Sequence, residues 1–357
     1  MREFLKRGKQ LWKLLTEIIK IMGAEIKGIE YVLPANKVNN EDLAKKFPEY
    51  DFAKFEDKVG IKNRYWVDEG QTALDLAFDA CQKLLNKYNK EDIDYLIYCT
   101  QSPEYFLPTT ACILQDKLGL NKNIGSFDYN LGCSGYVYGV SLAKALIESG
   151  QCSNVLLVTS ETYSKYIHPE DKSNLAIFGD GATATLISNS DTEKIGSFMF
   201  GTDGGGAEKL IIKNGAGKNK FNSCSPQLTY GSDNIYTDNH LYMNGPEIFN
   251  FTAENIPNFT DEVLKKNNIL KEDPDFYVFH QANSFMLEFL RKRIKVDKEK
   301  FYINLEDSGN TVSNTIPIAL KRLSGSFTDN SDKKVVIVGF GVGLSWAGGL
   351  ITINKNI

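Results

Sequence analysis

Three residues of different chemical type each follow a short apolar run of the kind that forms a β-strand. Cys133 follows FDYNL and precedes the helical pattern YVYGVSLAKALIESG, His280 follows FYVF, and Asn310 lies in the loop after FYINL. Active residues of α/β proteins gather beyond the carboxyl ends of strands. A cysteine thiolate can attack a thioester, and histidine and asparagine side chains can donate hydrogen bonds to a developing oxyanion. Together the three residues predict nucleophilic chemistry on a thioester carbonyl.

Each of the three residues also has a purely structural interpretation. Cys133, between Gly132 and Gly135, stands near a helix N-terminus, where the helix dipole and free N–H groups stabilise a thiolate. The alternative is a buried cysteine at a packed strand–helix junction. His280 could be a hydrogen-bonded interior histidine, and Asn310 could cap the helical run IPIALKRL that follows it. Their joint occurrence at equivalent strand ends favours the catalytic interpretation.

Composition argues against several other classes of protein. The 357 residues carry a net charge of −4, which gives no support to a duplex-binding basic surface. None of the six cysteines forms a Cys-x-x-Cys pair and there are only three histidines, so zinc, thioredoxin-like and large histidine-based metal sites are not indicated. No apolar stretch reaches the roughly 18 residues of a membrane-spanning helix. We expect a cytoplasmic protein without a metal.

The chain repeats itself across its two halves. Segments 90–102 and 271–284 both read as an acidic turn, a β-rich apolar run and a polar loop. Phe127 and Phe301 begin a second matching pair, and NVLLVTSE and KVVIVGFG form a third, in the same order. Apolar runs alternate with helical patterns, which predicts mainly parallel or mixed sheets covered by helices. Two core-forming halves also fit a chain longer than the roughly 250–300 residues at which single cores tend to split.

A glycine-rich segment lies near the C-terminus. It reads VVIVGFGVGLSWAGGLITI and contains Gly339, Gly341 and Gly343 between two strand-like runs. A G-x-G-x-G sequence at a strand end can bind a dinucleotide, but the helix and acidic ribose partner of such a site do not follow. A glycine turn between two strands is the better interpretation, and such a turn can aim backbone N–H groups into a site.

The first 22 residues are expected to form a basic N-terminal extension. Residues 1–20 contain six Lys or Arg and two Glu, which gives six minus two, or +4. The apolar residues that fall on one helical face are Phe4, Leu11, Leu15, Ile18 and Met22. The pattern predicts an amphipathic helix that packs on the protein or on a partner subunit, with contact to an anionic membrane surface as the alternative. A secretory signal is not expected, because polar residues interrupt the apolar run.

Taken in order, these motifs resemble β-ketoacyl-[acyl carrier protein] synthase III, a condensing enzyme of the thiolase superfamily. The matching segments, from about Gly23 to the C-terminus, are VGIKNRYW, LPTTACILQDKLGL, NLGCSGYVYGVSLAKALIESG, FGDGATATLI, HQAN, GNTVSNTIPIAL and GFGVGLSWAGGLI. The resemblance implies an α/β fold of the thiolase-like, five-layer αβαβα type. Its two similar halves would be residues 23–195 and 196–357, and the family is usually homodimeric.

By motif, the resemblance also implies roles for individual residues. Cys133 takes the position of the acylated nucleophile, and His280 and Asn310 take the other two catalytic positions. The oxyanion hole is expected from the backbone N–H groups of Cys133, Gly341, Val342 and Gly343. Residues expected at the substrate are Leu107, Asn283 and Phe340. The polar stretch 213–238 is expected to cover the substrate.

The reaction implied by the resemblance is a decarboxylative Claisen condensation. Cys133 takes an acyl group from an acyl-CoA or acyl-carrier thioester. Malonyl-[acyl carrier protein] then loses carbon dioxide, and its carbanion attacks the acyl-Cys to give a 3-oxoacyl thioester. The acyl carrier protein is the expected partner, and no metal or redox cofactor is required.

Three positions depart from the best-known pattern of this family. Phe285 stands where a carrier-docking Arg is expected, Lys54 stands in place of a Trp, and Leu107 stands in place of a Phe before proline. The alternative is therefore a specialised paralogue with a non-acetyl primer, in secondary or glycan-related acyl biosynthesis. Arg291 and Lys295, four residues apart in the helical pattern after HQAN, are the predicted carrier-docking residues instead.

Three rival interpretations are less well supported. A papain-like cysteine hydrolase has Cys, His and Asn in the same order, but its nucleophile lies near the N-terminus and its chain is not duplicated. A biosynthetic thiolase would use a second cysteine near the C-terminal glycines, and this chain has none after Cys224. A non-catalytic scaffold of thiolase fold is weakened by the presence of all three chemical residues.

Overall fold

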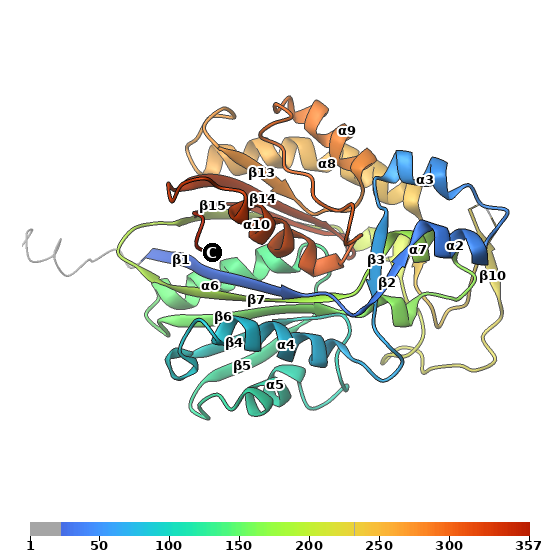
Figure 1. The fold of residues 1–357 in the computed structure, drawn as a ribbon, viewed down its shortest axis with the longest axis horizontal. Coiled ribbons are helices and arrows are strands. Elements are labelled where there is room, and N and C mark those ends of the chain that lie inside the picture. Colours follow the sequence, from blue (N-terminus) through green and yellow to red (C-terminus); the bar gives the residue numbers. More distant parts are fainter. Residues whose placement is uncertain (1–22, 232) are drawn as a thin grey trace, which may run out of the picture.

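The computed structural model describes residues 23–231 and 233–357. Two β-sheets lie face to face with helices between them, and further helices cover the outer side of each sheet (Figure 1). This is the five-layer αβαβα arrangement that the sequence predicts. The amphipathic helix expected over residues 1–22 lies outside the described residues.

The first half of the chain builds one sheet, with the strand order β1-β7-β6-β4-β5. β4 pairs parallel with β5 and β6, whereas β7 runs antiparallel to β6 and β1. The strands are β1 Gly23–Val32, β4 Tyr95–Cys99, β5 Gly125–Tyr129, β6 Asn154–Glu161 and β7 Gly181–Ser190, and the outer helices are α4 Ala73–Leu85 and α5 Thr110–Leu118. α4 begins where the sequence predicts, because Thr72 and Asp75 form a capping box.

The second half repeats this sheet with the order β13-β14-β15-β8. Its strands are β8 Ile195–Thr202, β13 Phe276–Phe279, β14 Lys333–Gly341 and β15 Ser345–Ile353, and its outer helices are α8 Gly245–Lys266 and α9 Ser284–Ile294. β13 runs parallel to β14, and β15 runs antiparallel to β14 and β8, as in the first sheet. Phe301 makes only an isolated parallel bridge to Tyr277 where the first half has the whole of β5. The predicted duplication is confirmed, with a shorter edge in the second copy.

Two helices form the middle layer and share one core with both sheets. They are α6 Gly135–Glu148 and α10 Thr315–Gly325. Val140 of α6 and Leu320 of α10 are fully buried in a cluster that includes Val155 of the first sheet and Ile337 of the second. Burying each such side chain contributes about 1.5–3 kcal/mol. This shared core holds the N-terminal ends of α6 and α10 in a defined position against the strand ends.

Several short elements gather at one end of the layers (Figure 1). They include β2 Asn36–Asn39, α2 Asn40–Lys46, α3 Phe52–Val59, β3 Asn63–Trp66, α7 Lys172–Ile177 and β10 Leu228–Tyr230. The other short strands are β9 Leu210–Ile211, β11 Asn234–Tyr236 and β12 Tyr242–Met243, and the 3-10 turns are η1 Lys90–Asp92, η2 Tyr163–Tyr166, η3 Gly204–Lys209 and η4 Val312–Asn314. Apolar residues of α2, α3 and α7 share one cluster with Cys133. These elements therefore pack around the strand ends where the predicted site lies.

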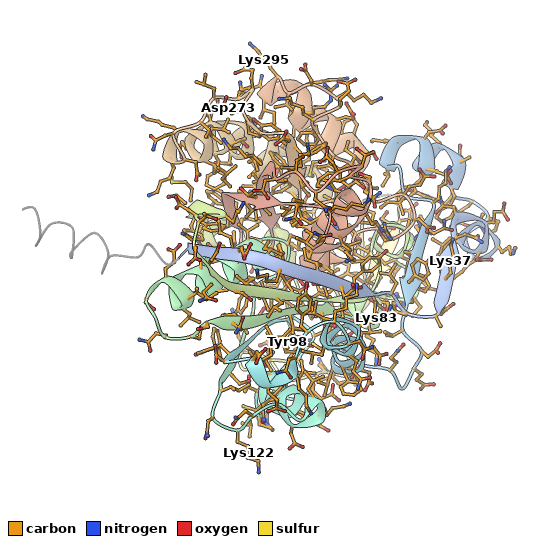
Figure 2. The ribbon with its side chains drawn as sticks, turned by 60° about the vertical axis from the view of Figure 1, so that its left-hand side comes forward. Lys37, Lys83, Tyr98, Lys122, Asp273 and Lys295 are labelled. Carbon is orange, nitrogen blue, oxygen red and sulfur yellow. The ribbon has the colours of Figure 1, made fainter. Side chains whose placement is uncertain are left out.

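Charged side chains cover the outside of this arrangement. Figure 2 shows Lys37, Lys83, Lys122, Asp273 and Lys295 on the surface, while Tyr98 of β4 lies inside the fold. Across residues 23–231 and 233–357, no helix has the length and apolar character needed to cross a bilayer.

Candidate active site

Cys133 lies in the tight connection from β5 to α6, immediately before the N-cap residue Ser134. Its side chain is buried, and the backbone N–H groups of Cys133 and Val342 lie near enough to its sulfur to lower the pKa of the thiol. A Cβ atom on Gly341 would lie 2.8 Å from Cys133 Sγ, so only glycine lets the end of β14 approach the thiol this closely. Two backbone N–H groups therefore lie beside the sulfur, and they would act as an oxyanion hole if they also reach the oxygen of a carbonyl bonded to that sulfur.

The electrostatics of the Cys133 thiol differ from the expectation based on its place in the sequence. Burial raises the pKa of the thiol to about 12, the Glu161 carboxyl also raises it, and the two N–H groups lower it by less. Burial therefore opposes, in the free protein, the stabilisation of the thiolate that is expected at the α6 N-terminus. The physical reason is that a thiolate loses the solvation of water when it is buried.

His280 follows β13, and its backbone N–H donates to Val338 O at 2.8 Å. The side chain is 2% exposed, and Nδ1 lies 2.7 Å from Thr315 Oγ1. Burial lowers the pKa of the imidazole to about 3. His280 is therefore a neutral imidazole at physiological pH, anchored through Nδ1.

Asn310 is held by both its backbone and its side chain. Its N–H donates to Ile177 O at 2.9 Å, and its C=O accepts from the N–H of Gly179 at 3.0 Å. Asn310 Oδ1 accepts from the N–H of Val312 at 2.9 Å. α10 begins only at Thr315, so the helix-cap interpretation of Asn310 is wrong. Because Oδ1 of Asn310 is held by Val312, the Nδ2 hydrogens of the same amide can be donated to a ligand.

The end of β14 brings the three predicted residues to one place. The Phe340 ring packs edge-on against the His280 ring with centroids 5.7 Å apart, while the next residue, Gly341, touches Cys133. A Cβ on Gly132, the residue before Cys133, would lie 2.6 Å from Val342 Cγ1 and 3.3 Å from Val312 Cγ1. The segment after Asn310 therefore also packs next to Cys133. A glycine turn between β14 and β15, as predicted, is what makes this convergence possible.

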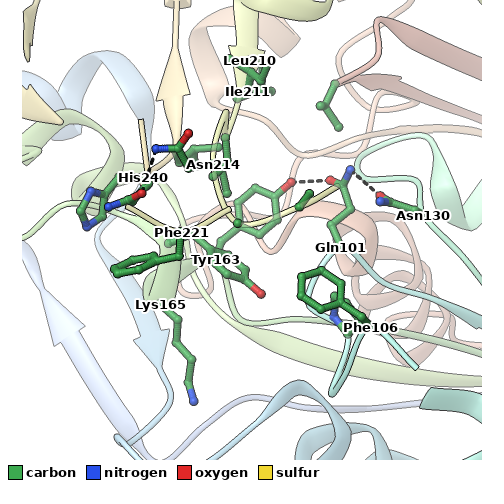
Figure 3. A pocket seen from close by; sticks show the side chains of 18 of the residues that line it. Gln101, Phe106, Asn130, Tyr163, Lys165, Leu210, Ile211, Asn214, Phe221 and His240 are labelled. Atoms are coloured by element: carbon green, nitrogen blue, oxygen red, sulfur yellow. Dashed lines mark hydrogen bonds between the residues drawn. The ribbon is translucent and has the colours of Figure 1, made fainter. Parts of the chain in front are cut away.

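A cavity of about 820 Å³ extends to Val342, next to Cys133 in the fold, although Cys133, His280 and Asn310 do not themselves line it. Its wall next to the thiol contains Gln101, Tyr163 and Val342. Tyr163 Oη donates to Gln101 Oε1 at 2.5 Å, and Gln101 Nε2 donates to Asn130 Oδ1 at 2.9 Å, as Figure 3 shows. Apolar residues of the lining include Phe106, Leu210, Ile211, Ile212, Phe221 and Leu241. Phe221 belongs to the stretch expected to cover the substrate, so that stretch forms part of the wall.

Comparison with known proteins decides the family. The family model described as 3-oxoacyl-[acyl-carrier-protein (ACP)] synthase III matches residues 127–204, and the model of its C-terminal part matches residues 264–353. A β-ketoacyl-[acyl-carrier-protein] synthase III of Clostridium perfringens is 36% identical over 333 residues, which cover 92% of this chain and 99% of that protein. The chain belongs to the β-ketoacyl-[acyl-carrier-protein] synthase III family.

Solved structures of synthase III proteins have the same fold as this member. One crystal structure of a 3-oxoacyl-(acyl-carrier-protein) synthase III is 44% identical, with a TM-score of 0.89, and the match covers 92% of this chain and 99% of that one. The synthase III of Thermus thermophilus is 30% identical, with a TM-score of 0.80, and the match covers 93% and 99%. The predicted family, thiolase-like fold and condensing acyltransferase class are confirmed. The papain-like interpretation is wrong.

The three residues of this synthase III chain expected to contact the substrate differ from one another in burial and contacts. Phe340 is 2% exposed, and its ring packs against the ring of His280. Asn283 Oδ1 accepts from the N–H of Met286 at 2.8 Å and so caps α9. Leu107 is 83% exposed, and the cavity is lined instead by the preceding residues Tyr105 and Phe106. In the single chain, therefore, neither Leu107 nor Phe340 lines the cavity.

The predicted carrier-docking pair does not form a free basic face on α9. Arg291 Nε donates to Glu288 Oε2 at 3.0 Å, and an Arg291 Nη donates to Val296 O at 3.1 Å. Lys295 lies beyond the last helical residue, as a left-handed C-cap with φ 57°. Figure 2 shows it at the outer tip of the molecule. The expectation that the two residues share a helix face is wrong, because the helix ends between them and Arg291 is already paired.

Glu161 is a buried acid of this site that sequence reasoning missed. It is the last residue of β6 and is 0% exposed. Its carboxyl accepts from Gln101 N at 3.0 Å, Ser102 Oγ at 3.3 Å and Ser313 Oγ at 2.9 Å. It therefore ties together the loops after β4 and after Asn310. A signal was present, since Glu161 ends the run NVLLVTSE that repeats as KVVIVGFG.

We expect Glu161→Gln to change how stability depends on pH. Burial raises the pKa of Glu161 from 4.5 to about 8, so the folded chain retains a proton that the unfolded chain releases above pH 4.5. Wild-type stability therefore falls as pH rises from 4.5 toward 8, on the order of 1 kcal/mol per pH unit from this group. Glutamine, the neutral isostere, removes this loss. The Tm of wild type and of Glu161→Gln, measured at about pH 5 and at about pH 8, tests this prediction. If the Tm difference between the two proteins is the same at both pH values, the prediction is wrong.

Proposed function

We propose that this chain catalyses the decarboxylative condensation of an acyl thioester with malonyl-[acyl carrier protein], through an acyl-Cys133 intermediate. The observation that carries the proposal is the meeting of three groups at the end of β14. Cys133 has two backbone donors at its sulfur, while His280 and Asn310 are each anchored through one atom of the side chain. Such a site can stabilise one oxyanion at the cysteine and a second at the imidazole and amide.

In the first stage, Cys133 is acylated. The Cys133 thiol gives its proton to solvent water, which is also the source of the proton that the departing thiolate later takes up, and the sulfur attacks the carbonyl carbon of the primer thioester. The negative oxygen of the tetrahedral intermediate accepts hydrogen bonds from the N–H groups of Cys133 and Val342. The carbon–sulfur bond to the carrier then breaks, and the departing thiolate takes up a proton. The acyl group remains on Cys133, with its chain directed into the cavity.

In the second stage, the malonyl thioester is decarboxylated and condensed. His280 Nε2 and Asn310 Nδ2 donate hydrogen bonds to the malonyl thioester oxygen. The bond to the carboxylate breaks, carbon dioxide leaves, and the electron pair forms an enolate that these donors stabilise. The enolate carbon attacks the acyl carbonyl, and Cys133 is expelled as a thiolate. The electron pairs balance without a metal or redox cofactor, so we propose that none is used.

Mass spectrometry of the intact protein tests the proposal directly. Incubation with an acyl-CoA is expected to add one acyl group, and later addition of malonyl-carrier is expected to remove it with release of carbon dioxide and a 3-oxoacyl-carrier. Absence of any mass shift across a panel of acyl-CoAs favours the non-catalytic scaffold. A shift that malonyl-carrier does not discharge argues against the condensing step in particular.

The cavity supports a primer larger than acetyl. Pockets of about 300–1,000 Å³ enclose ligands of drug size, and the cavity beside Cys133 measures about 820 Å³. Leu210, Ile211 and Leu241 give it an apolar lining. We therefore propose a non-acetyl primer with an apolar chain, as in the specialised-paralogue alternative. If acetyl-CoA acylates Cys133 faster than longer acyl-CoAs do, the proposal of a non-acetyl primer is wrong.

We propose that the acyl carrier protein docks on α3 and not at the end of α9. α3 presents Lys54 and Lys58, which are exposed and one turn apart. Lys58 Nζ lies 5.2 Å from the centre of the Phe285 ring in the first turn of α9, shortly after His280 in the chain. Acyl carrier proteins are acidic, so the patch formed by Lys54 and Lys58 can steer their approach, although α3 also carries the acidic residues Glu56 and Asp57.

Reversing the charge of this patch is expected to weaken carrier docking. Lys54→Glu with Lys58→Glu should raise the KM for malonyl-carrier about 10-fold at low salt, with less effect at high salt because ions screen the attraction. Loading from acyl-CoA should change by less than about 2-fold, since the CoA route lacks the acidic protein surface. The matched control is Lys292→Glu with Arg293→Glu at the far end of α9. If the control raises KM equally, the α3 patch is not the docking surface.

Assembly and location are also proposed. β5 is an edge strand of the first sheet in the described residues, and Phe106 and Leu107 are each 83% exposed. An open strand edge and exposed apolar side chains favour an interface between copies. We propose a cytoplasmic homodimer, with residues 1–22 contacting the partner subunit or a membrane surface; light scattering of the full chain checks the dimer.

A further inference from the structure

A single residue of unusual backbone conformation lies between the two anchored side chains. Val312 has φ 57°, in the left-handed region, although it is a β-branched residue and fully buried. Such a conformation is strained for valine and persists only where the surroundings hold it. Val312 lies two residues after Asn310 and three before Thr315, so the strained conformation falls between these two residues.

The backbone of Val312 contacts both anchoring groups. Its N–H donates to Asn310 Oδ1 at 2.9 Å. Its C=O accepts from the backbone N–H of Thr315 and lies 3.1 Å from Thr315 Oγ1. Thr315 Oγ1 in turn lies 2.7 Å from His280 Nδ1, and all four residues are at most 5% exposed. A continuous chain of hydrogen bonds therefore runs from Asn310 through Val312 and Thr315 to His280.

The Thr315 hydroxyl has one hydrogen and two neighbours that can accept it. The contact with His280 Nδ1, at 2.7 Å, is shorter than the contact with Val312 O, at 3.1 Å. The Val312 carbonyl already receives the Thr315 N–H and does not depend on the hydroxyl. His280 Nδ1 is a buried ring nitrogen with Thr315 Oγ1 as its partner, and it can either accept the hydroxyl hydrogen or donate a hydrogen of its own. The hydroxyl is free to donate to Nδ1 because the Val312 carbonyl keeps the Thr315 N–H, and this arrangement leaves Nε2 as the donor that the proposed reaction needs.

We propose that Thr315 and Val312 are positioning residues that set the two donors of the site. Thr315 donates its hydroxyl hydrogen to His280 Nδ1, which leaves the ring hydrogen of the neutral imidazole on Nε2. Val312 N–H holds Asn310 Oδ1, which leaves Asn310 Nδ2 as the outward donor. The role in decarboxylation rests on the proposed function, whereas the tautomer of His280 is a property of the free protein.

Comparing Thr315→Val with Thr315→Ser tests the role in the reaction. Valine keeps the shape of threonine but cannot donate, so malonyl decarboxylation is expected to fall about 10- to 100-fold, while acyl loading of Cys133 changes by less than about 3-fold. Serine keeps the hydroxyl and should restore decarboxylation to within about 3-fold of wild type. Equal losses of both half-reactions in the valine variant, or no rescue by serine, overturn the proposal in favour of packing alone.

The chain offers a matched control for the loss of a buried threonine hydroxyl. Thr311 is 1% exposed, and its Oγ1 has no hydrogen-bond partner among the described residues. Thr311→Val makes the same chemical change in the same segment and should leave both half-reactions within about 2-fold of wild type. A loss as large as that of Thr315→Val shows that the segment, and not the Thr315 hydroxyl, is responsible.

Nuclear magnetic resonance of ¹⁵N-histidine-labelled protein tests the tautomer without reference to activity. The chain has only three histidines, so a His280→Gln sample identifies the His280 signals. At neutral pH the wild type and Thr315→Ser should carry the ring hydrogen on Nε2, and Thr315→Val should show a mixture of tautomers. A hydrogen on Nδ1 in the wild type overturns the assignment and makes Thr315 the acceptor. This result stands whether or not the condensing activity is found.

Discussion

Cys133→Ser is expected to abolish both acyl loading and condensation, with a loss of roughly 10³-fold or more in condensation. The thiolate is the nucleophile, and a serine hydroxyl in the same position ionises far less readily. Because burial holds the Cys133 pKa at about 12, we also expect wild-type loading to rise with pH from about pH 6 to pH 9 without a plateau. Intact-mass and peptide-mapping measurements follow the acyl group.

Cys112→Ser is the matched control for this change. Cys112 is an exposed cysteine of α5, and its replacement removes a thiol of greater accessibility than Cys133. Loading and condensation should both stay at the wild-type level. An acyl adduct that maps to Cys112, Cys99 or any other cysteine shows that Cys133 is not the nucleophile.

His280→Ala is expected to separate the two half-reactions. Decarboxylation of malonyl-carrier should fall on the order of 10²–10³-fold, the effect typical of removing one oxyanion donor. Acyl loading should fall by less than about 5-fold, because the donors placed at the sulfur are the N–H groups of Cys133 and Val342. Release of labelled carbon dioxide measures the first step, and the intact mass measures the second.

The pH dependence of wild-type decarboxylation gives an independent check on His280. Its pKa is lowered to about 3, so the imidazole stays neutral at every pH above that value. Decarboxylation by the acylated protein should therefore show no step between about pH 5.5 and pH 7.5, the range in which an ordinary histidine titrates. A step there, or equal loss of loading and decarboxylation in His280→Ala, identifies His280 as a base for the thiol instead.

Local sequence alone was enough for an α/β fold with two similar halves and for placing Cys133 and His280 after strands, whereas the five-layer type came from the family resemblance. The strand-like runs before Cys133 and His280 and the capping pair Thr72 and Asp75 act over a few neighbouring residues, where propensity and periodicity apply. The duplication was visible because both halves bury the same pattern of apolar residues. Where neighbours decide the structure, the expectation held.

Helix termini and paired charges were less predictable. Lys295 continues the helical pattern of α9 in the sequence, yet the helix ends at Ile294 and Lys295 takes the left-handed C-cap position. Arg291 reads as a free surface charge, yet it is paired with Glu288 and Val296. A helix end depends on the balance of capping and tertiary contacts over one or two residues, which periodicity does not resolve.

Only the tertiary structure decided the protonation states and the anchoring of the site. Thr315 and His280 are 35 residues apart, and Ser313 and Glu161 are 152 apart, so no local pattern links them. The pKa of Cys133 depends on how completely the folded layers exclude water, and this desolvation opposes the effect expected at a helix N-terminus. The sequence thus determined which chemical groups stand at the strand ends. Burial and long-range hydrogen bonds, which exist only after the two halves pack together, shift the pKa values of those groups and anchor their side chains.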